Sequence, residues 1–549
     1  MEVPKTVKTL GICAVFCLLN VPAIVGQNLP SKGSTFHNPI LPGFYPDPSI
    51  CRVNEDYYLV TSTFEYYPGI PIFHSKDLVH WNQIGHVLDR PSQLELDSIK
   101  PSGGVFAPTI RFHNGTFYVI NTLVGKKGNF VVTATNPAGP WSDPHWIADA
   151  PGIDPSLFFD DDGRSYYTGN IRPDSIPKES KYRSIWLQEW DLKSMKLIGE
   201  RSIILNEGAL HGANNAEAPH LYKVRGMYYL MIAEGGTGEN HAVTIFRSKN
   251  LRGPYEGNKK NPILTHRHLG SDYPIAATGH ADMTDTQDGD WWMVMLGVRP
   301  YGGFHHNLGR ETFLASVTWE DGWPVVNAGY GKVLEESVAP NLPPWPFPST
   351  PACDNFDSNV LGFSWNVLRT PRERFYSLTD RSGFLRLKLR KEMITKWENP
   401  SFVGRRQQHI NFSASTAMEF VPKSENESAG IVVLQNPDYH FRVECLKSGK
   451  ENVVRLTKRH GGREETLAEM PMASKRVYLK VEATGQDYNF FVASVAGEWK
   501  VLREHVDGRT LSRTNAGGFV GTYIGLYASS NGKASKNVAD FDWFEYKGE

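Results

Sequence analysis

The sequence predicts an all-β protein made of two domains that differ in character. Fifty Gly and 36 Pro are spread along the 549 residues, and aromatic residues are abundant, with 14 Trp, 23 Tyr and 28 Phe. This composition is typical of many short strands joined by turns. No long segment carries apolar residues at helical spacing, which disfavours a fold of alternating strands and helices. A short phrase also recurs five times in the first part of the chain.

Residues 1–26 have the features of a secretion signal. Lys5 and Lys8 give a basic start, and the run from Gly11 to Val25 is almost wholly apolar. Because this run is short for a membrane span, we expect cleavage near Gly26 and a soluble, secreted, extracellular protein, with an N-terminal membrane anchor as the alternative. Three Asn-x-Ser/Thr triplets fit a secreted glycoprotein, and they begin at Asn114, Asn411 and Asn426.

Charge and cysteine content narrow the class of protein further. Lys and Arg number 58 against 59 Asp and Glu, so the chain lacks the basic excess that binds nucleic acid or an anionic membrane surface. Removal of the signal leaves Cys51, Cys353 and Cys445. This odd number allows at most one disulfide within the chain, and their spacing does not suggest a metal site. We expect buried thiols.

The first domain, residues 36–337, contains the five copies of the phrase. Each copy leads into a turn signal and an aromatic strand, and equivalent positions are separated by 60, 47, 64 and 62 residues. Such an interval holds about four short strands, which is the size of one β-propeller blade. Acids at equivalent positions of a radial repeat would converge on its axis. The copies begin at Asp47, Ala107, Asp154, Ala218 and His280.

A proline-rich segment, residues 338–351, predicts a stiff, extended link between the domains. After it, residues 352–549 alternate apolar and polar side chains over short runs such as Phe384 to Leu389. Alternation of this kind is typical of half-buried antiparallel strands. Because the phrase does not recur there, we expect a jelly-roll β-sandwich.

Three carboxylates are the candidates for chemistry. Asp47 and Asp154 occupy the same place in two copies of the phrase, and Glu217 lies immediately before the fourth copy. An Asp-Pro pair alone usually forms a turn, and a lone Glu is often part of an ion pair. Two Asp at the same place in the repeat, each between apolar neighbours, favour a functional site over a turn. One protonated and one ionised carboxyl group are what glycoside hydrolysis requires, and aromatic side chains suit sugar rings.

The phrases around these acids resemble glycoside hydrolase family 43, and most closely its β-xylosidases with a C-terminal sandwich domain. The resemblance covers about residues 36–547 and implies a five-bladed propeller and an inverting mechanism. It implies Asp47 as general base, Glu217 as general acid, and Asp154 as the residue that raises the pKa of the acid and orients it. Inversion would place the two catalytic carboxyl groups roughly 6.5–9.5 Å apart. The motifs that carry the resemblance are Tyr45-Pro46-Asp47-Pro48-Ser49, Gly152-Ile153-Asp154-Pro155-Ser156, Ala216-Glu217-Ala218-Pro219-His220 and Thr278-Gly279-His280-Ala281.

The resemblance also suggests residues that would contact the sugar. Arg299 would bind sugar hydroxyls, with a surface ion pair as its alternative, and Phe64 would lie beside the sugar, with a place in the core as its alternative. Phe106 stands where many relatives have Trp. Phe519 would reach over the site from the C-terminal domain. His280 would point to the propeller axis and bind a calcium ion or a buried water, with a core histidine as its alternative. We expect that catalysis requires no cofactor.

These implications favour an exo-acting β-1,4-xylosidase that releases xylose from xylo-oligosaccharides, including those derived from arabinoxylan. A domain that caps one end of the pocket would favour short substrates. An α-L-arabinofuranosidase, or an enzyme with both activities, is the near alternative, because the two sugars present similar hydroxyl groups. A catalytically dead carbohydrate-binding propeller is the remote one, and the presence of all three acids argues against it.

Overall fold

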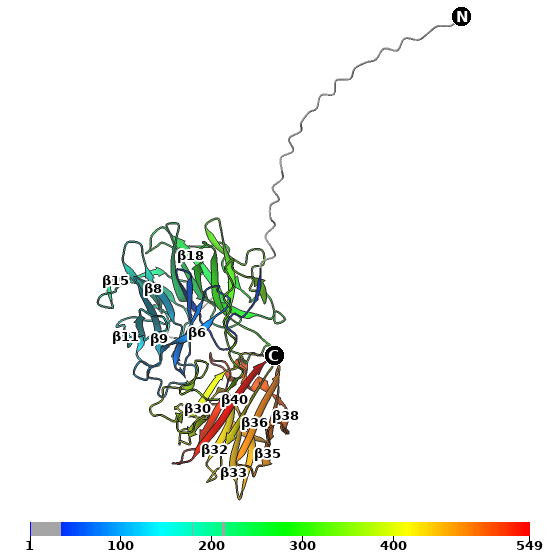
Figure 1. Cartoon of the computed structure of the whole chain (residues 1–549). Helices are drawn as coiled ribbons and strands as arrows, with labels where there is room; N and C mark the ends of the chain where they lie inside the picture. Colours follow the sequence, from blue (N-terminus) through cyan, green and yellow to red (C-terminus); the bar gives the residue numbers. More distant parts are fainter. Residues whose placement is uncertain (2–33, 178, 211–214) are drawn as a thin grey trace. The chain divides into compact units, whose positions relative to one another are not determined.

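The computed structural model describes residues 1, 34–177, 179–210 and 215–549, and nearly all of the regular structure in these ranges is β-strand (Figure 1). The predicted signal segment lies outside the described residues except for Met1. Residues Thr35–Glu549 form one compact unit. In the described ranges the helical elements are a 3-10 turn, η1 (Gly508–Leu511), and one short helix, α1 (Arg513–Ala516). Neither is long and apolar enough to cross a membrane.

Five antiparallel sheets make up the first domain, and each of the five predicted phrases lies at or within the first long strand of one sheet. Two sheets carry an additional short strand, β7 (Gly104–Val105) or β20 (Leu264–Thr265). The first sheet comprises β2 (Ser49–Val53), β3 (Asp56–Val60), β5 (Gly69–Ser75) and β6 (Asn82–Leu88). The second comprises β8 (Thr109–His113), β9 (Thr116–Val124), β10 (Gly128–Ala134) and β11 (His145–Trp146). The third comprises β12 (Ser156–Phe159), β13 (Ser165–Ile171), β14 (Ser184–Asp191) and β15 (Lys196–Leu205). The last two comprise β16 (Glu217–Val224), β17 (Met227–Glu234), β18 (Ala242–Ser248) and β19 (Glu256–Gly257); and β21 (Ala276–Asp285), β22 (Trp291–Val298), β23 (Glu311–Glu320) and β24 (Trp323–Val326).

The five sheets are arranged radially. Their first strands contact one another in a closed cycle, from β2 to β8, β12, β16, β21 and back to β2. Apolar side chains fill the spaces between neighbouring sheets, as where Met231 and Ile245 pack with Met293 and Phe313. The ends of the domain also meet, because β1 (Thr35–His37) pairs with β25 (Glu336–Val338). The predicted five-bladed propeller is therefore confirmed.

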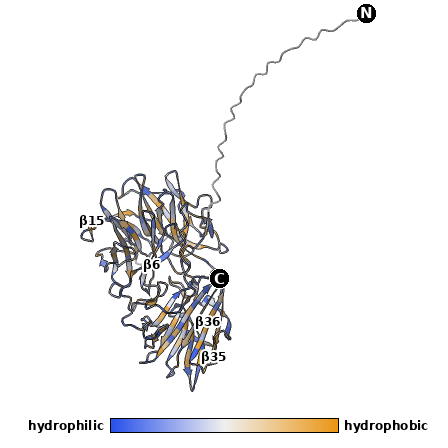
Figure 2. Ribbon diagram, viewed as in Figure 1, coloured by the Kyte–Doolittle hydropathy of each residue, from blue (hydrophilic) through white to orange (hydrophobic). Residues whose placement is uncertain are grey.

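The second domain consists of two antiparallel sheets with a common core, which confirms the predicted β-sandwich. Strands such as β36 alternate buried and part-exposed residues along their length, and the hydropathy colours of Figure 2 follow this pattern. One sheet comprises β26 (Cys353–Asp354), β28 (Tyr376–Ser377), β29 (Leu385–Lys388), β31 (Phe412–Glu419), β36 (Arg476–Thr484), β37 (Asp487–Ala493), β38 (Lys500–Asp507) and β40 (Val538–Gly548). The other comprises β30 (Ser401–Arg406), β32 (Ser428–Asn436), β33 (Tyr439–Ser448), β34 (Glu451–His460), β35 (Arg463–Pro471) and β39 (Tyr523–Ser529).

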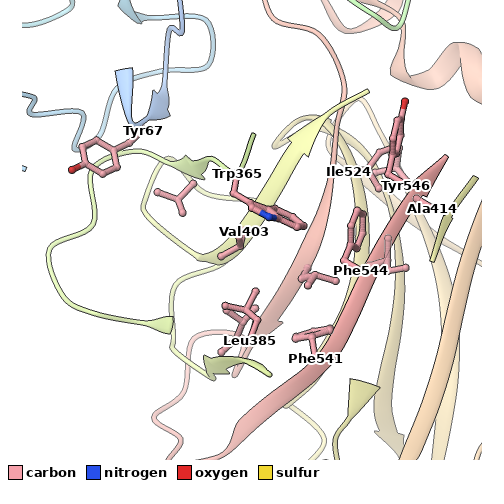
Figure 3. Close-up of a cluster of buried hydrophobic side chains, with 14 of the residues drawn as sticks. Tyr67, Trp365, Leu385, Val403, Ala414, Ile524, Phe541, Phe544 and Tyr546 are labelled. Carbon is pink, nitrogen blue, oxygen red and sulfur yellow. The ribbon is translucent and has the colours of Figure 1, made fainter. Parts of the chain in front are cut away.

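Apolar side chains from both sheets form the core of the sandwich. Figure 3 shows Leu385 and Phe541 from one sheet and Val403 and Ile524 from the other, all of them buried in one cluster. Each such side chain contributes about 1.5–3 kcal/mol by its removal from water. The three cysteines contribute no disulfide, because Cys51, Cys353 and Cys445 are free; Cys51 and Cys445 are buried and Cys353 is partly exposed.

Sandwich and propeller are joined by main-chain pairing as well as by side chains. β27 (Val367–Leu368) pairs with β4 (Tyr66–Tyr67) of the propeller domain. The ring of Tyr66 stacks on Tyr523, with 3.8 Å between ring centroids and planes 10° apart. Arg406 donates from Nε to the carbonyl oxygen of Phe44 at 2.6 Å. These contacts hold sandwich loops against the face of the propeller on which the predicted acids lie.

Candidate active site

The repeated phrase turns the backbone sharply where each inner strand begins. Asp47, Asp154 and His280 hold equivalent places in three sheets, and their φ angles are 56°, 53° and 47°. Beside Glu217, Ala218 has a φ of 49°. Left-handed backbone is uncommon outside glycine, costs about 1–3 kcal/mol for each residue and is concentrated at functional sites. The phrase thus sets both the position of each side chain and its direction toward the axis.

One cavity brings most of the predicted site residues together. Its volume is about 570 Å³, and it lies where the propeller face meets a loop of the sandwich. The three acids come from the first, third and fourth sheets, and one of the aromatic residues comes from the sandwich. The predicted residues that line the cavity are Asp47, Asp154, Glu217, Phe64, Phe106, His280 and Phe519.

Asp47 is held as an ionised carboxylate. Its side chain is almost fully buried, yet Arg310 donates from Nη1 to Oδ1 at 2.6 Å and Ser62 donates from Oγ to Oδ2 at 2.6 Å. Burial opposes ionisation, but Arg310, His280 and Ser62 together outweigh it and hold the pKa of Asp47 below its usual range. Asp47 is therefore charged at neutral pH and suited to accept a proton.

Glu217 and Asp154 have the opposite character. Burial raises the pKa of Glu217 to about 7, with the nearby charge of Asp47 adding to the rise and Arg183 and Lys181 opposing it. Burial and the neighbouring carboxylates also raise the pKa of Asp154 well above its usual range. Because the two groups interact, their titration belongs to the pair, and the pair keeps a proton near neutral pH. A protonated carboxyl group is what donation to a leaving group requires.

The predicted role of Arg299 is not supported by its position. Arg299 does not line the cavity and instead donates from Nε and Nη2 to Glu311, at 2.8 and 2.9 Å. Arg310 holds the place beside Asp47. Both arginines belong to the β22–β23 hairpin, in which Gly297 pairs with Glu311. The register of this hairpin decides which arginine reaches the axis, and the chemical type of the residue gives no signal of it.

Three phenylalanines form an aromatic wall beside Arg310. Phe64 lies 5.0 Å from Phe106 and 5.8 Å from Phe519 between ring centroids. The Arg310 guanidinium carbon lies 5.5 Å from the Phe64 ring and 5.6 Å from the Phe519 ring, within cation–π range. The backbone N–H of Phe519 donates to Ser102 Oγ at 2.8 Å, which anchors the sandwich loop to the propeller. Apolar faces of this kind suit the carbon faces of a sugar ring.

His280 lines the cavity, with its Nδ1 3.8 Å from Asp47 Oδ1. Burial lowers its pKa, so the ring is neutral near pH 7. Two residues further along β21, Asp282 is fully buried and receives hydrogen bonds from Ser49, Tyr222 and Arg111. Arg111 also contacts His220 Nδ1 at 2.9 Å. Four of the five sheets thus contribute to one buried polar cluster around Asp282.

This cluster bears on the calcium ion that the resemblance implies at His280. Among the described residues, no group of three or more His, Cys, Asp and Glu side chains is placed to hold a metal ion. The buried carboxylate nearest to His280 along β21 already pairs with the Arg111 guanidinium, at 2.8 Å. A divalent cation beside this fixed positive charge would be repelled. The described residues therefore do not fit a calcium ion at this position.

Sequence reasoning missed the loop that follows β17. Residues 235–241 supply Thr237 and His241 to the cavity. Gly235 has a φ of 83°, and a side chain there would lie 2.1 Å from the carbonyl oxygen of Asn240. The Gly-Gly-Thr-Gly sequence was a usable signal, because such a run marks a close approach of the backbone. Arg513, which also lines the cavity, gave no comparable signal.

Comparisons with known proteins agree with this arrangement. The chain matches the family model for glycosyl hydrolases family 43 over residues 36–324 and that for the beta xylosidase C-terminal concanavalin A-like domain over residues 353–547. It is 48% identical to a xylosidase/arabinosidase of Butyrivibrio fibrisolvens, over 92% of this chain and 98% of the relative. It is 44% identical to a non-reducing end α-L-arabinofuranosidase of Bacteroides ovatus, over 95% of this chain and 96% of the relative.

A solved structure supports the same conclusion. The xylan β-1,4-xylosidase of Bacillus halodurans has a TM-score of 0.88 and 37% identity, and the match covers 93% of this chain and 100% of that one. The family model spans more than half of this chain, and the two relatives are matched over nearly their full length. The protein is a glycoside hydrolase of the xylosidase/arabinosidase type, and it belongs to glycoside hydrolase family 43.

Proposed function

We propose that this protein is an inverting, exo-acting β-1,4-xylosidase that releases xylose from the non-reducing ends of xylo-oligosaccharides. The observation that carries the proposal is the contrast between two buried carboxyl groups in one cavity. Asp47 has a lowered pKa and Glu217 has a pKa raised to about 7. Such a pair supplies a base and an acid at the same pH.

In this mechanism Asp47 takes a proton from a water molecule while that water attacks the anomeric carbon. Glu217 gives its proton to the glycosidic oxygen of the departing sugar. Asp154 keeps the proton available, because a second carboxylate near Glu217 disfavours ionisation of the pair. Arg310 is bound to Asp47 through Nη1 and Nη2 and fixes the orientation of the base.

The aromatic wall and the sandwich loop at the cavity support the proposed exo-action. Phe519 and Arg513 come from the second domain and line the same cavity as the acids. A pocket walled on this side accepts the end of a chain more readily than its middle. With xylohexaose as substrate, we expect xylose to be the first product, and early release of xylobiose and xylotriose would contradict exo-action.

The α-L-arabinofuranosidase alternative is supported by the names of two similar proteins, those of Butyrivibrio fibrisolvens and Bacteroides ovatus. Hydrolysis of nitrophenyl β-D-xylopyranoside and nitrophenyl α-L-arabinofuranoside, measured side by side as kcat/KM, separates the two activities. A higher value for the xyloside supports the proposal. A value for the arabinofuranoside more than about tenfold higher, which is 1.4 kcal/mol in transition-state binding, would contradict it.

Inversion is tested by the anomer that forms first. Proton NMR of nitrophenyl β-D-xylopyranoside hydrolysis, in which all the xylose formed comes from the cleaved glycoside, should show α-xylose before mutarotation, because water enters on the face opposite to the leaving group. Early β-xylose would point to retention instead.

We also propose that the protein is exported, on the basis of the apolar run in residues 1–26. N-terminal sequencing of protein recovered outside the cell should begin near Gln27.

A further inference from the structure

Arg513 is a cation of the sandwich domain that lines the cavity of the propeller. It begins helix α1, and two of its nitrogens hold backbone carbonyls. Nε donates to Gly518 at 2.6 Å, within its own loop, and Nη1 donates to Thr237 at 2.8 Å, across the domain boundary. The guanidinium is thereby held in one orientation, which is a requirement for selective recognition.

The charge of Arg513 lacks a carboxylate partner among the described residues. No ion pair of Arg513 occurs there, whereas Arg310 is bound to Asp47 at 2.6 Å. Burial and the nearby Arg310 lower the pKa of Arg513 to about 10. A partly buried guanidinium without a carboxylate partner is stabilised by further oxygen acceptors, beyond the two carbonyls that it already binds. Because Nε and Nη1 hold these two carbonyls, Nη2 remains as the donor for a ligand in the cavity.

Hydrogen bonds place Arg513 on the side of the general base. Thr237 accepts from Arg513 at its carbonyl oxygen and from Arg310 Nη1 at Oγ1, the latter at 3.2 Å. Arg310 in turn binds Asp47. The cations that act on Glu217 are different ones, Arg183 and Lys181. Arg513 is thus linked through Thr237 and Arg310 to the general base, and it is not among the cations that act on Glu217.

We propose that Arg513 determines specificity by donating hydrogen bonds to the hydroxyl groups on C3 and C4 of the terminal xylose, the end of the ring remote from the scissile bond. This inference rests on the proposed xylosidase function and names a contact within it. A chain that continued beyond C4 would meet Arg513 and the Phe519 loop. The same contact would thus recognise a free non-reducing end.

The test compares the loss of a hydroxyl group with the loss of the arginine. D-Xylose and its 2-deoxy, 3-deoxy and 4-deoxy analogues are measured as competitive inhibitors of nitrophenyl β-D-xylopyranoside hydrolysis. With the natural protein, removal of the C3 or C4 hydroxyl should weaken inhibition about tenfold or more, as for a hydrogen bond to a charged group. The quantity compared is the inhibition constant of each deoxy analogue divided by that of D-xylose. In Arg513→Leu this ratio should fall to about one to two for the 3-deoxy or 4-deoxy analogue, while the ratio for the 2-deoxy analogue stays unchanged.

Unchanged ratios for the 3-deoxy and 4-deoxy analogues in Arg513→Leu would overturn the inference. A ratio that falls only for the 2-deoxy analogue would also overturn it. Arg513→Lys keeps the charge but offers one donor nitrogen without the planar fork of arginine, and it should show intermediate ratios, which secures the test should the leucine variant fold poorly. Asn515→Ala is the matched control, because it removes a bond from Nδ2 to the Arg509 carbonyl oxygen in the same loop without reaching the cavity. Its ratios should equal those of the natural protein.

The two proposals fail in different ways. An unmodified protein that does not hydrolyse the nitrophenyl xyloside counts against the xylosidase function itself. An active protein whose C3 and C4 ratios are unaffected by Arg513→Leu counts against Arg513 alone. A loop that merely loosens would weaken binding of all four sugars by the same factor, and this outcome would also overturn the inference.

Discussion

Two aspartates of the propeller, Asp47 and Asp282, share a chemical type, deep burial and an arginine partner, yet they are suited to different tasks. Asp282 receives donors from Ser49, Tyr222 and Arg111 and is surrounded by protein on all sides. Asp47 has Arg310 and Ser62 as donors and borders the cavity. Both oxygens of each carboxylate accept hydrogen bonds, so the difference lies in access: the enclosed Asp282 stabilises the fold, whereas Asp47 lines a cavity in which a water molecule could give it a proton.

The largest expected effect is on catalysis at the open site. Asp47→Asn and Glu217→Gln should each lower kcat for nitrophenyl xyloside by about 10²–10⁴-fold, because each removes one proton-transfer group. Circular dichroism should show intact folding. Asp285→Asn, which alters an exposed carboxylate of the same propeller paired with Arg52, is the control and should remain active. Near-normal turnover by either variant would contradict the assignment of Asp47 as general base and Glu217 as general acid.

The closed site should respond in stability instead. Asp282→Ala leaves the Arg111 charge buried without its partner, which costs about 3–5 kcal/mol in free energy of unfolding. Thermal and denaturant unfolding measure this loss. Since the pKa of Asp282 is far below its usual range, its contribution is present above pH 4 and is lost as pH falls. A variant as stable as the natural protein would show that the cluster is not a structural centre.

The pH profile should separate the base from the acid. Activity should fall at low pH as Asp47 becomes protonated and fall at high pH as Glu217, with a pKa of about 7, loses its proton. Arg310→Met removes the cation that keeps the pKa of Asp47 low, so the acidic limb of kcat/KM should move to higher pH. An acidic limb that does not move would assign that limb to another group.

The smallest expected effect is that of metal removal. Because Arg111 already supplies positive charge beside Asp282, we expect treatment with a chelator to leave kcat/KM within about twofold of its original value. Calcium added afterwards should change nothing. Activity that disappears with the chelator and returns with calcium would contradict the assignment of Arg111 as the cation of this cluster.

Much of the fold and part of the site were predictable from local patterns. The repeated phrase located the first long strand of each of the five propeller sheets, and it singled out Asp47, Asp154 and Glu217, which the structure places in one cavity. The three phenylalanines were also predictable, once the resemblance was recognised. Arg299 was predicted to bind sugar hydroxyls, with an ion pair as its alternative; it pairs with Glu311, and Arg310, which was not predicted, lines the cavity, because the register of a hairpin is set by pairing between strands.

The sequence by itself determined the all-β class, the five-fold repeat and the types of residue at its strand entrances. These follow from short-range rules of strand alternation, turns and proline, which need no knowledge of distant contacts. Only the tertiary structure decided the pairing of Asp47 with Arg310, the closed cluster around Asp282 and the entry of Arg513 into the cavity. The contacts of Asp47 with Arg310, of Asp282 with Arg111 and of Thr237 with Arg513 each join residues more than 150 positions apart, and such contacts arise from packing of sheets and domains that no local pattern encodes.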